Sequence, residues 1–289
     1  MLEYTRKSKI KEVINDPVFE DYGRLLFPVE HYYYSGNTLE QLDLTWYSEI
    51  NPDKTVEIIN YLKKQRLQNK PIFFPIYTQE EIKKDPNKKD TGLFYFQGLP
   101  DHKTAIINAG GAFAYVGAMH DSFPHALELS KKGYNAFALI YRSGARNACE
   151  DLSKAIAFIH QNADALQLDV HNYSLWGGSA GARMAAWLGS YGTNTFIHED
   201  YPLPGAVIMQ YTGLSDIFGN EPPTYNCVGT NDYIASYTTM QQRIHRIKQN
   251  GTPAKIEIFR GLSHGFGLGQ GTIAEGWIDH AIKFWEENS

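Results

Sequence analysis

The feature that most constrains the fold of this chain is the pentapeptide Gly177-Gly178-Ser179-Ala180-Gly181, which fits the pattern G-x-S-x-G. A short apolar segment precedes it, and residues that favour a helix follow it. A serine at a sharp strand-to-helix turn is held in a strained backbone with its hydroxyl exposed, and the glycines leave room for chain that passes close by. The following helix points free N–H groups at the serine, where negative charge would develop. Because 25 of the 289 residues are glycine, the alternative is a plain glycine-rich turn, and motifs elsewhere in the chain are needed to choose between the two.

The chain after residue 90 shows a regular alternation of short apolar segments and helical patterns. Strands are predicted over 93–97, 104–108, 136–141, 173–176, 205–210, 224–228 and 255–259. Helices are predicted over 123–132, 149–163, 180–188, 234–249 and 272–287. This alternation predicts an α/β fold with a mostly parallel, doubly wound sheet and helices on both faces. In such a sheet the reactive groups gather outside the carboxyl ends of the strands.

The first 90 residues differ from the rest of the chain. They are rich in aromatic side chains, contain one predicted helix over 55–65, and show no alternation of strand and helix. We therefore divide the chain into an aromatic-rich N-terminal extension, 1–90, and a main domain, 91–289. The extension could be a cap over the site or a packing segment, and its aromatic residues favour burial, since Tyr and Phe usually bury most of their area.

Composition limits the classes of partner and location. The net charge of −5 and the lack of clustered Lys and Arg argue against a nucleic-acid partner. No signal-peptide core and no apolar run of roughly 18 residues is present, so we expect no membrane contact and a cytoplasmic protein. The two cysteines, Cys149 and Cys227, form neither a disulfide framework nor a C-x-x-C metal site.

A serine nucleophile needs a histidine base and an acid that orients this histidine. Behind a G-x-S-x-G turn, the chain order is serine, acid, histidine. Among the histidines after Ser179, His264 lies in a glycine-rich loop directly after the predicted strand 255–259. His245 and His280 fall within predicted helices, and His198 follows no clear strand. The sequence therefore predicts His264 as the base.

Two aspartates compete for the role of the acid. Asp232 lies just beyond the predicted strand 224–228, and Asp216 also follows a strand. We favour Asp232, with Asp216 as the alternative. Either residue could instead cap the next helix.

The oxyanion of a tetrahedral intermediate needs N–H donors. One candidate is the backbone of Ala180, directly after the nucleophile, and the others are Gly110, Gly111 and Ala112, in the loop after the predicted strand 104–108. A dinucleotide-binding loop is excluded, because no G-x-G-x-x-G occurs there. His120, Asp121 and His125 are spaced poorly for a metal site and are expected to cap a helix or to line the rim of the pocket. No metal and no cofactor are expected.

These motifs resemble the α/β-hydrolase superfamily, in its esterase/lipase branch near the acetyl-esterase and hormone-sensitive-lipase-like enzymes. The resemblance covers about residues 93–289 and rests on the following motifs: Gly110-Gly111-Ala112-Phe113, Tyr141-Arg142, Gly177–Gly181, Gly229-Thr230-Asn231-Asp232 and His264-Gly265-Phe266. It implies carboxylester hydrolysis with Ser179 as nucleophile, Asp232 as acid and His264 as base. The oxyanion loop departs from the family, because Ala109 and Ala112 replace the first residue and the last glycine of His-Gly-Gly-Gly. Backbone N–H groups survive both changes.

The resemblance and the residues together predict a serine carboxylic-ester hydrolase that works through an acyl-enzyme. We expect short acyl groups of the acetyl type and a small-molecule ester substrate, with acetylated carbohydrate as one candidate. One alternative is a serine peptidase of the prolyl-oligopeptidase type, although the chain has no room for a propeller domain. Another is a non-catalytic binding protein on the same fold, although such proteins typically lose the serine or the histidine. The sequence does not predict the oligomeric state.

Overall fold

The computed structural model describes residues 3–47 and 50–289. Residues 1–2 and 48–49, which belong to the predicted extension, lie outside the described residues. The strands are β1 Tyr34–Ser35, β2 Asp43–Leu44, β3 Phe73–Pro75, β4 Gly92–Phe96, β5 His102–Asn108, β6 Asn135–Ile140, β7 Leu168–Gly178, β8 Ala206–Gln210, β9 Thr224–Gly229 and β10 Ala254–Phe259. The α-helices are α1 Ile10–Ile14, α2 Pro52–Leu67, α3 Gln79–Lys84, α4 Ala118–Asp121, α5 Phe123–Lys131, α6 Ala145–Gln161, α7 Ala163–Leu166, α8 Ala180–Tyr191, α9 Asn194–Ile197, α10 Tyr237–Gln249 and α11 Trp277–Asn288.

One eight-stranded sheet forms the centre of the molecule, in the order β10-β9-β8-β7-β5-β6-β4-β3. Every pairing from β10 to β6 is parallel, whereas β4 runs antiparallel to both β6 and β3. The predicted α/β fold with a mostly parallel, doubly wound sheet is therefore confirmed. The sequence analysis missed β3, which comes from the extension and adds a strand to the sheet.

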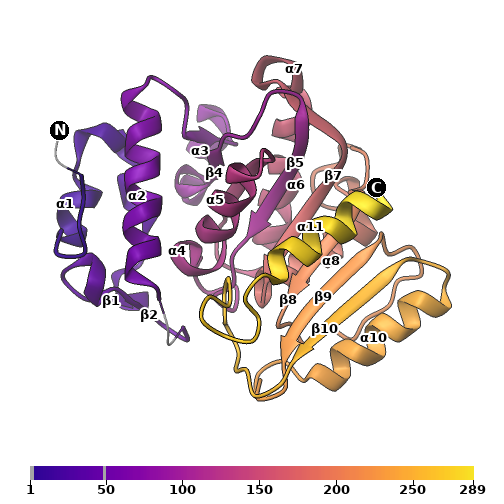
Figure 1. Cartoon of the computed structure of the whole chain (residues 1–289). Coiled ribbons are helices and arrows are strands. Elements are labelled where there is room, and N and C mark those ends of the chain that lie inside the picture. The colour runs from indigo at the N-terminus through magenta and orange to yellow at the C-terminus, as the bar shows by residue number, and fades with distance from the viewer. Residues whose placement is uncertain (1–2, 48–49) are drawn as a thin grey trace.

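Helices cover both faces of this sheet. In Figure 1, α5 and α11 cross in front of the strands, and α6 and α8 lie behind them. The helix α2 stands beside α5 at the indigo end of the molecule, where the extension packs. The parallel strands run so that their carboxyl ends meet at the lower edge of this view. The loops that follow these strands therefore gather at one edge, as expected for this architecture.

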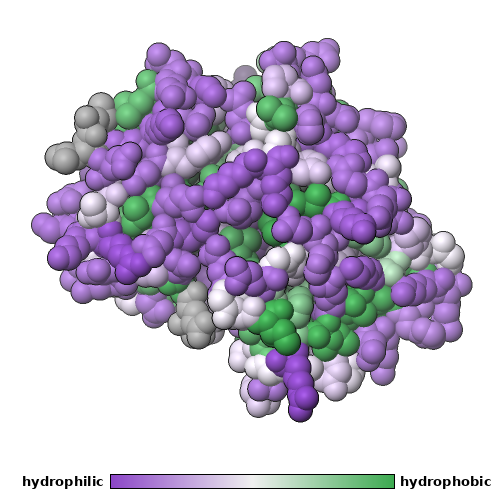
Figure 2. Space-filling view, in the orientation of Figure 1, coloured by the Kyte–Doolittle hydropathy of each residue, from purple (hydrophilic) through white to green (hydrophobic). Residues whose placement is uncertain are grey.

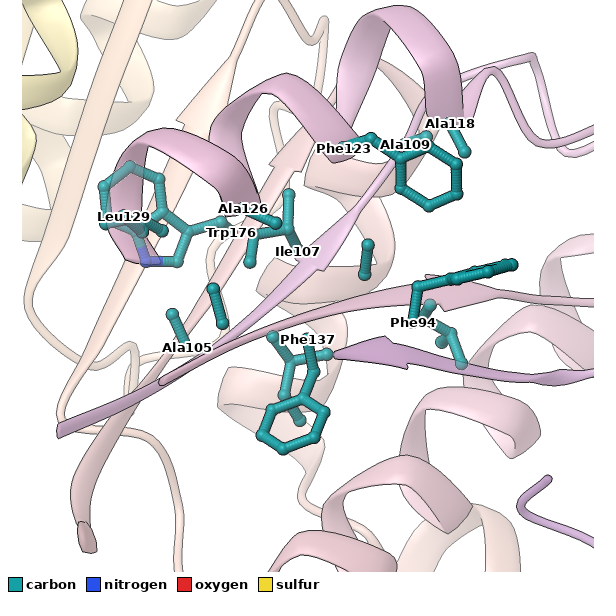
Figure 3. Close-up of a cluster of buried hydrophobic side chains, with 14 of the residues drawn as sticks. Phe94, Ala105, Ile107, Ala109, Ala118, Phe123, Ala126, Leu129, Phe137 and Trp176 are labelled. Carbon is teal, nitrogen blue, oxygen red and sulfur yellow. The ribbon is translucent and has the colours of Figure 1, made fainter. Parts of the chain in front are cut away.

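The core fills the space between the sheet and the helices. Figure 3 shows Phe123 and Leu129 of α5 on one side of the strands, together with Trp176 of β7, and Phe137 of β6 on the other side. Trp176 also contacts Trp277 of α11, with ring centroids 6.1 Å apart. Aromatic rings of this size bury much apolar area and fix how the helices seat on the sheet.

The extension shares this core. Tyr22 stacks on Phe73 of β3 at 5.2 Å and meets the edge of Phe94 of β4 at 6.2 Å. Buried residues from both parts of the chain belong to one continuous hydrophobic cluster. Burial of its aromatic residues, which the sequence favoured, holds for Phe19 and Tyr47 but not for Tyr32, which is 75% exposed.

Several helix boundaries differ from the sequence-based prediction, and three of them have a visible cause or lie near a glycine turn. The helix predicted over 272–287 begins only at Trp277, after Gly276 with a φ of +87°, a backbone conformation that a helix cannot contain. The helix predicted over 234–249 begins at Tyr237, because the preceding residues form a turn around Asp232. The helix predicted over 149–163 begins four residues earlier, at Ala145, directly after Gly144.

A buried ion cluster lies beyond the carboxyl end of β6. The guanidinium of Arg142 pairs with Asp85, Glu150 and Asp151 at 2.7 to 3.0 Å. Asp151 also accepts hydrogen bonds from the Tyr77 hydroxyl at 2.5 Å and from the backbone N–H of Arg142 at 2.7 Å. This network ties the segment before β4 to the start of α6.

The surface in Figure 2 is mostly hydrophilic, and hydrophobic side chains gather near its lower edge. That edge is the one at which the parallel strands end. Within residues 3–47 and 50–289, no helix has the length and apolar composition needed to cross a membrane.

We predict that folding stability depends on the protonation of His125 in α5. Burial lowers the pKa of His125 from 6.5 to about 4. Between these values the unfolded chain binds a proton that the folded protein does not, so stability present above pH 6.5 is lost as the pH falls toward 4. A shift of this size corresponds to about 3 kcal/mol. Urea unfolding of His125→Gln, whose amide can still donate to Gln210, should show a shallower loss between pH 6.5 and 4. Equal slopes for the two proteins would contradict this linkage.

Candidate active site

Ser179 lies at the turn between β7 and α8 with φ +50° and ψ −114°. A non-glycine residue with positive φ is strained and must be held by its surroundings. The N–H of Ser179 donates to the carbonyl of Gln210 in β8 at 3.0 Å, which fixes the turn to the neighbouring strand. The serine is half-buried. The strained strand-to-helix turn that the pentapeptide predicts is therefore present.

The glycines around Ser179 are required by close packing. A Cβ on Gly177 would lie 2.3 Å from the backbone of Gly181, and a Cβ on Gly181 would lie 2.0 Å from the carbonyl oxygen of Asn108. Backbone atoms cannot yield at such distances. The start of α8 can therefore approach β5 and β7 only because these positions carry no side chain.

Ser179, His264 and Asp232 form a hydrogen-bonded chain. The Nε2 of His264 lies 3.1 Å from Ser179 Oγ, and its Nδ1 lies 2.8 Å from Asp232 Oδ2. Since a carboxylate only accepts, the proton on the neutral ring lies on Nδ1, and Nε2 is left to accept the serine proton. The other oxygen of Asp232 accepts the N–H groups of Ile234 and Ala235 at 2.8 and 2.7 Å. The Asp232 side chain is fully buried and thus fixed in both directions.

The competing residues lie elsewhere. Asp216 is exposed, and its carbonyl accepts a hydrogen bond from Arg243. His280 is exposed and pairs with Glu257. His198 and His245 are also exposed. Of the candidates weighed from the sequence, the structure brings Asp232 and His264 to Ser179.

The predicted oxyanion loop needs one correction. The N–H of Gly110 donates to Asp121 Oδ2 at 2.7 Å, so it is not free to bind a substrate oxygen. For the N–H groups of Gly111, Ala112 and Ala180, the described part of the chain provides no acceptor. These three remain the candidate donors. The correction could not be read from the sequence, because Asp121 follows Gly110 by 11 residues and meets it only through the fold.

His120, Asp121 and His125, which the sequence analysis considered as a metal site, each bind different partners within the chain. His120 Nε2 contacts the carbonyl of Gly265 at 2.7 Å, next to His264. His125 Nε2 contacts Gln210 Oε1 at 2.8 Å. Asp121 accepts hydrogen bonds from Gly110, Tyr47 and Tyr211. Among residues 3–47 and 50–289, no group of three or more His, Cys, Asp or Glu could hold a metal ion.

The sequence analysis missed two residues at the site. Tyr47, from the extension, is buried against the ring of His120 at 4.8 Å. Tyr211, after β8, meets the ring of His264 edge-on at 5.0 Å. No sequence motif marks a tyrosine as a residue that supports an active site. For Tyr211, its place directly after a buried strand was the available hint.

Of two cavities formed with the extension, one is lined by a residue of the triad. One, of about 340 Å³, is lined by the His264 ring, His120, Ser263 and residues of the loop before α11. The other, of about 240 Å³, is lined by Tyr115 and Tyr141 on the side of the oxyanion loop and by Phe27 of the extension. The extension contributes to the walls of each.

Comparison with known proteins concerns the fold of the chain. The model of the BD-FAE family matches residues 99–235, which include the oxyanion loop, Ser179 and Asp232. No functionally curated protein matches the chain significantly.

Among solved structures, esterase 2 of Thermogutta terrifontis in its apo form is similar, with 20% identity, a TM-score of 0.61, and coverage of 68% of this chain and 90% of that one. Its propionate-bound form has 21% identity, a TM-score of 0.61, and coverage of 68% and 89%. The acetyl ester-xyloside bifunctional hydrolase of Caldicellulosiruptor lactoaceticus has 20% identity, a TM-score of 0.64, and coverage of 74% and 95%. These likenesses confirm the α/β-hydrolase fold.

We predict that Gly181→Ala disrupts the turn at Ser179. The added Cβ would overlap the Asn108 carbonyl, and overpacking of this kind costs about 1–3 kcal/mol or more. The matched control is Gly213→Ala, whose Cβ would meet its nearest neighbour at an ordinary 3.7 Å. Thermal unfolding should show a lower midpoint for Gly181→Ala only. A wild-type midpoint for Gly181→Ala would refute the close packing described here.

Proposed function

We propose that the chain is an esterase of the α/β-hydrolase superfamily and that it hydrolyses carboxylic esters through an acyl-enzyme on Ser179. In the first half-reaction, Ser179 Oγ attacks the ester carbonyl carbon and its proton moves to His264 Nε2. The carbonyl π electrons move to the oxygen. The tetrahedral intermediate then collapses, and the alkoxide leaves with the proton from His264 as the free alcohol.

The second half-reaction releases the acid. Water, deprotonated by His264 Nε2, attacks the carbonyl carbon of the acyl-enzyme. Ser179 Oγ leaves and takes the proton back, which restores the starting state. The Asp232 carboxylate stays ionised throughout and stabilises the imidazolium that forms in each half-reaction.

The observation that carries this proposal is the hydrogen-bonded chain from Ser179 Oγ through His264 to Asp232, with contacts of 3.1 and 2.8 Å. The distance from Ser179 Oγ to His264 Nε2 is within reach for direct proton transfer, and the contact with Asp232 orients the ring. The strained serine backbone and the buried acid keep the three groups in register. A binding protein on this fold has no need to maintain such geometry.

We propose Ala180, Gly111 and Ala112 as the N–H donors to the oxyanion. Ala180 is the first residue of α8, so the positive end of the helix dipole reinforces its N–H. Gly111 and Ala112 lie in the loop after β5 with φ of +126° and +54°, which turns the backbone sharply beside the serine. Donors fixed in this way stabilise charge that develops only in the transition state.

We propose a short acyl group as the preferred substrate. The cavity that contains His264 is partly polar, because Ser263, Gln270 and Thr272 also line it, and such a wall suits a short acyl group better than a long apolar chain. The structurally similar proteins include a propionate-bound esterase and an acetyl ester-xyloside hydrolase, in line with acetyl-type esters and with acetylated carbohydrate as a candidate substrate. A cytoplasmic location stays a prediction from the sequence.

We further propose that residues 1–90 serve as one wall of the active site in addition to packing on the main domain. Tyr47 reaches Asp121, and Asn51 and Lys54 line the cavity that also contains His264. The extension thereby limits the space available to the substrate.

We predict that Ser179→Ala loses turnover of p-nitrophenyl acetate by several orders of magnitude, because no other group supplies the nucleophile. Ser215→Ala, which changes an exposed serine in the loop after β8, is the control and should retain wild-type rates. Comparison of acetate, butyrate and octanoate esters measures the chain-length preference, which should favour acetate. Absence of turnover by the folded wild type on all three would favour the peptidase or the binding protein instead.

We predict that Asp232→Asn lowers kcat by about 10⁴-fold, because an amide stabilises the wrong His264 tautomer and cannot balance the imidazolium. Asp216→Asn is the matched control, since this exposed aspartate also follows a parallel strand. Its rates should remain within about twofold of wild type, as for most exposed substitutions. Steady-state kinetics on the acetate ester checks both variants, and the reverse ranking would assign the acid to Asp216.

A further inference from the structure

Asp121 is a buried carboxylate that the reaction scheme above does not use. It is 1% exposed and accepts three hydrogen bonds: the Gly110 N–H at 2.7 Å, the Tyr47 hydroxyl at 2.9 Å and the Tyr211 hydroxyl. No Lys or Arg in the described residues pairs with it within 4 Å. A buried charge without a counter-ion is costly unless donors satisfy it. Three donors on two oxygens supply that compensation.

The two tyrosines act as fixed donors to this carboxylate. Burial, together with the negative charge of Asp121, raises the pKa of both Tyr47 and Tyr211 well above 10. Both hydroxyls therefore keep their protons at every pH at which the protein works.

Asp121 lies directly beneath the reacting groups. A Cβ on Gly178, next to the nucleophile, would lie 2.3 Å from Asp121 Oδ2. A Cβ on Gly110 would lie 2.9 Å from the same oxygen and 3.0 Å from Ser179 Cβ. The carboxylate thus fills the place where the oxyanion loop meets the serine turn, and only glycines fit around it.

The oxyanion loop needs an anchor at this point. Gly111, Ala112 and Phe113 follow one another with φ of +126°, +54° and +58°. For a non-glycine residue such a conformation costs of order 1–3 kcal/mol and persists only when neighbours enforce it. Gly110 is held on both sides, because its N–H donates to Asp121 and its carbonyl accepts from Gly117 at 3.0 Å. The residue before the strained run therefore has a defined direction.

We propose that Asp121 is a positioning residue of the ester hydrolysis proposed above, on which this inference rests. Its carboxylate accepts a hydrogen bond from the N–H of Gly110. This bond fixes the loop so that the next two N–H groups, of Gly111 and Ala112, point toward the substrate oxygen. Tyr47 fixes the carboxylate from the extension, and Tyr211, directly after β8, fixes it while its ring packs against His264. Asp121 thereby couples the oxyanion loop, the serine turn and the extension.

A positioning role makes a specific prediction about the Asp121 variants. In Asp121→Asn, the amide oxygen can still accept from Gly110 and Tyr47, while the amide nitrogen can donate to the Tyr211 oxygen. Asp121→Ala removes the anchor altogether. We expect kcat to fall about 10-fold in Asp121→Asn and at least about 100-fold in Asp121→Ala, the loss typical of one oxyanion donor. The KM should change by less than about threefold, because the anchor acts in the transition state.

The matched control is Asp151→Asn. Asp151 is also a buried carboxylate that accepts one tyrosine hydroxyl and one backbone N–H, but its partners are Tyr77 and Arg142 rather than residues of the site. The Asp151→Asn variant should have a lower free energy of unfolding than the wild type. At temperatures at which this variant remains folded, its kcat should be unchanged. Tyr47→Phe, which keeps the ring and removes only the hydroxyl, tests the same network if Asp121→Ala fails to fold.

The decisive measurement is the affinity of each variant for a trifluoromethyl ketone. Addition of Ser179 Oγ to this ketone gives a hemiketal whose oxygen occupies the oxyanion site. We expect the inhibition constant to rise across the Asp121 and Tyr47 variants in proportion to the loss of kcat/KM, with a logarithmic slope near one. Loss of kcat/KM with unchanged ketone affinity would overturn the positioning role. It would also be overturned if the activity of the Asp121 variants fell only in proportion to the folded fraction, which is the behaviour expected of Asp151→Asn. Failure of the proposed function itself would be seen earlier, as a folded wild type that hydrolyses no ester.

Discussion

The backbone of Ser179 is the constraint on which the rest of the structure depends. A serine at φ +50° is strained and stays there only because three glycines admit neighbouring chain at distances that no side chain allows. This packing fixes α8 against β5 and β7, and the bond from Ser179 N to Gln210 O fixes the turn to β8. The loops that bring the base, the acid and the oxyanion donors are then placed relative to one rigid point.

The hydrogen-bonded triad could be predicted from the sequence because residues that directly follow parallel strands lie at the same edge of the sheet. Asp232 and His264 each follow a short strand, and the carboxyl ends of parallel strands meet at one edge. The central strands are strong signals, since buried strands of a parallel sheet are nearly continuously hydrophobic. The edge strand β10 is instead marked by alternation of Lys255 and Glu257 with isoleucines. What determined the residues was therefore their place just after a strand, rather than any property of the histidine or aspartate itself.

The supports of the site could not be predicted in this way. The hydrogen bond between Gly110 and Asp121 depends on how α4 folds back under the loop, and Tyr47 joins it from 74 residues away. The strand β3 was equally hidden, because three residues with a proline at one end give little periodicity. Helix boundaries next to the site also shifted, since the Asp232 carboxylate caps a turn that a helical pattern alone would extend. Each of these features arises from tertiary contacts that override local preference.

The contacts of the extension argue for a fixed wall rather than a moving lid in its Tyr47 region. An opening motion would have to break the bond from Tyr47 to Asp121 and expose a carboxylate that is otherwise buried. It would also separate Tyr22 from Phe73 and Phe94, and thus expose aromatic area in the shared core. Since β3 is itself hydrogen-bonded to β4, this movement would strain the edge of the sheet as well. We infer that the substrate enters past this wall, and that the extension contributes to the site by holding Asp121 in place.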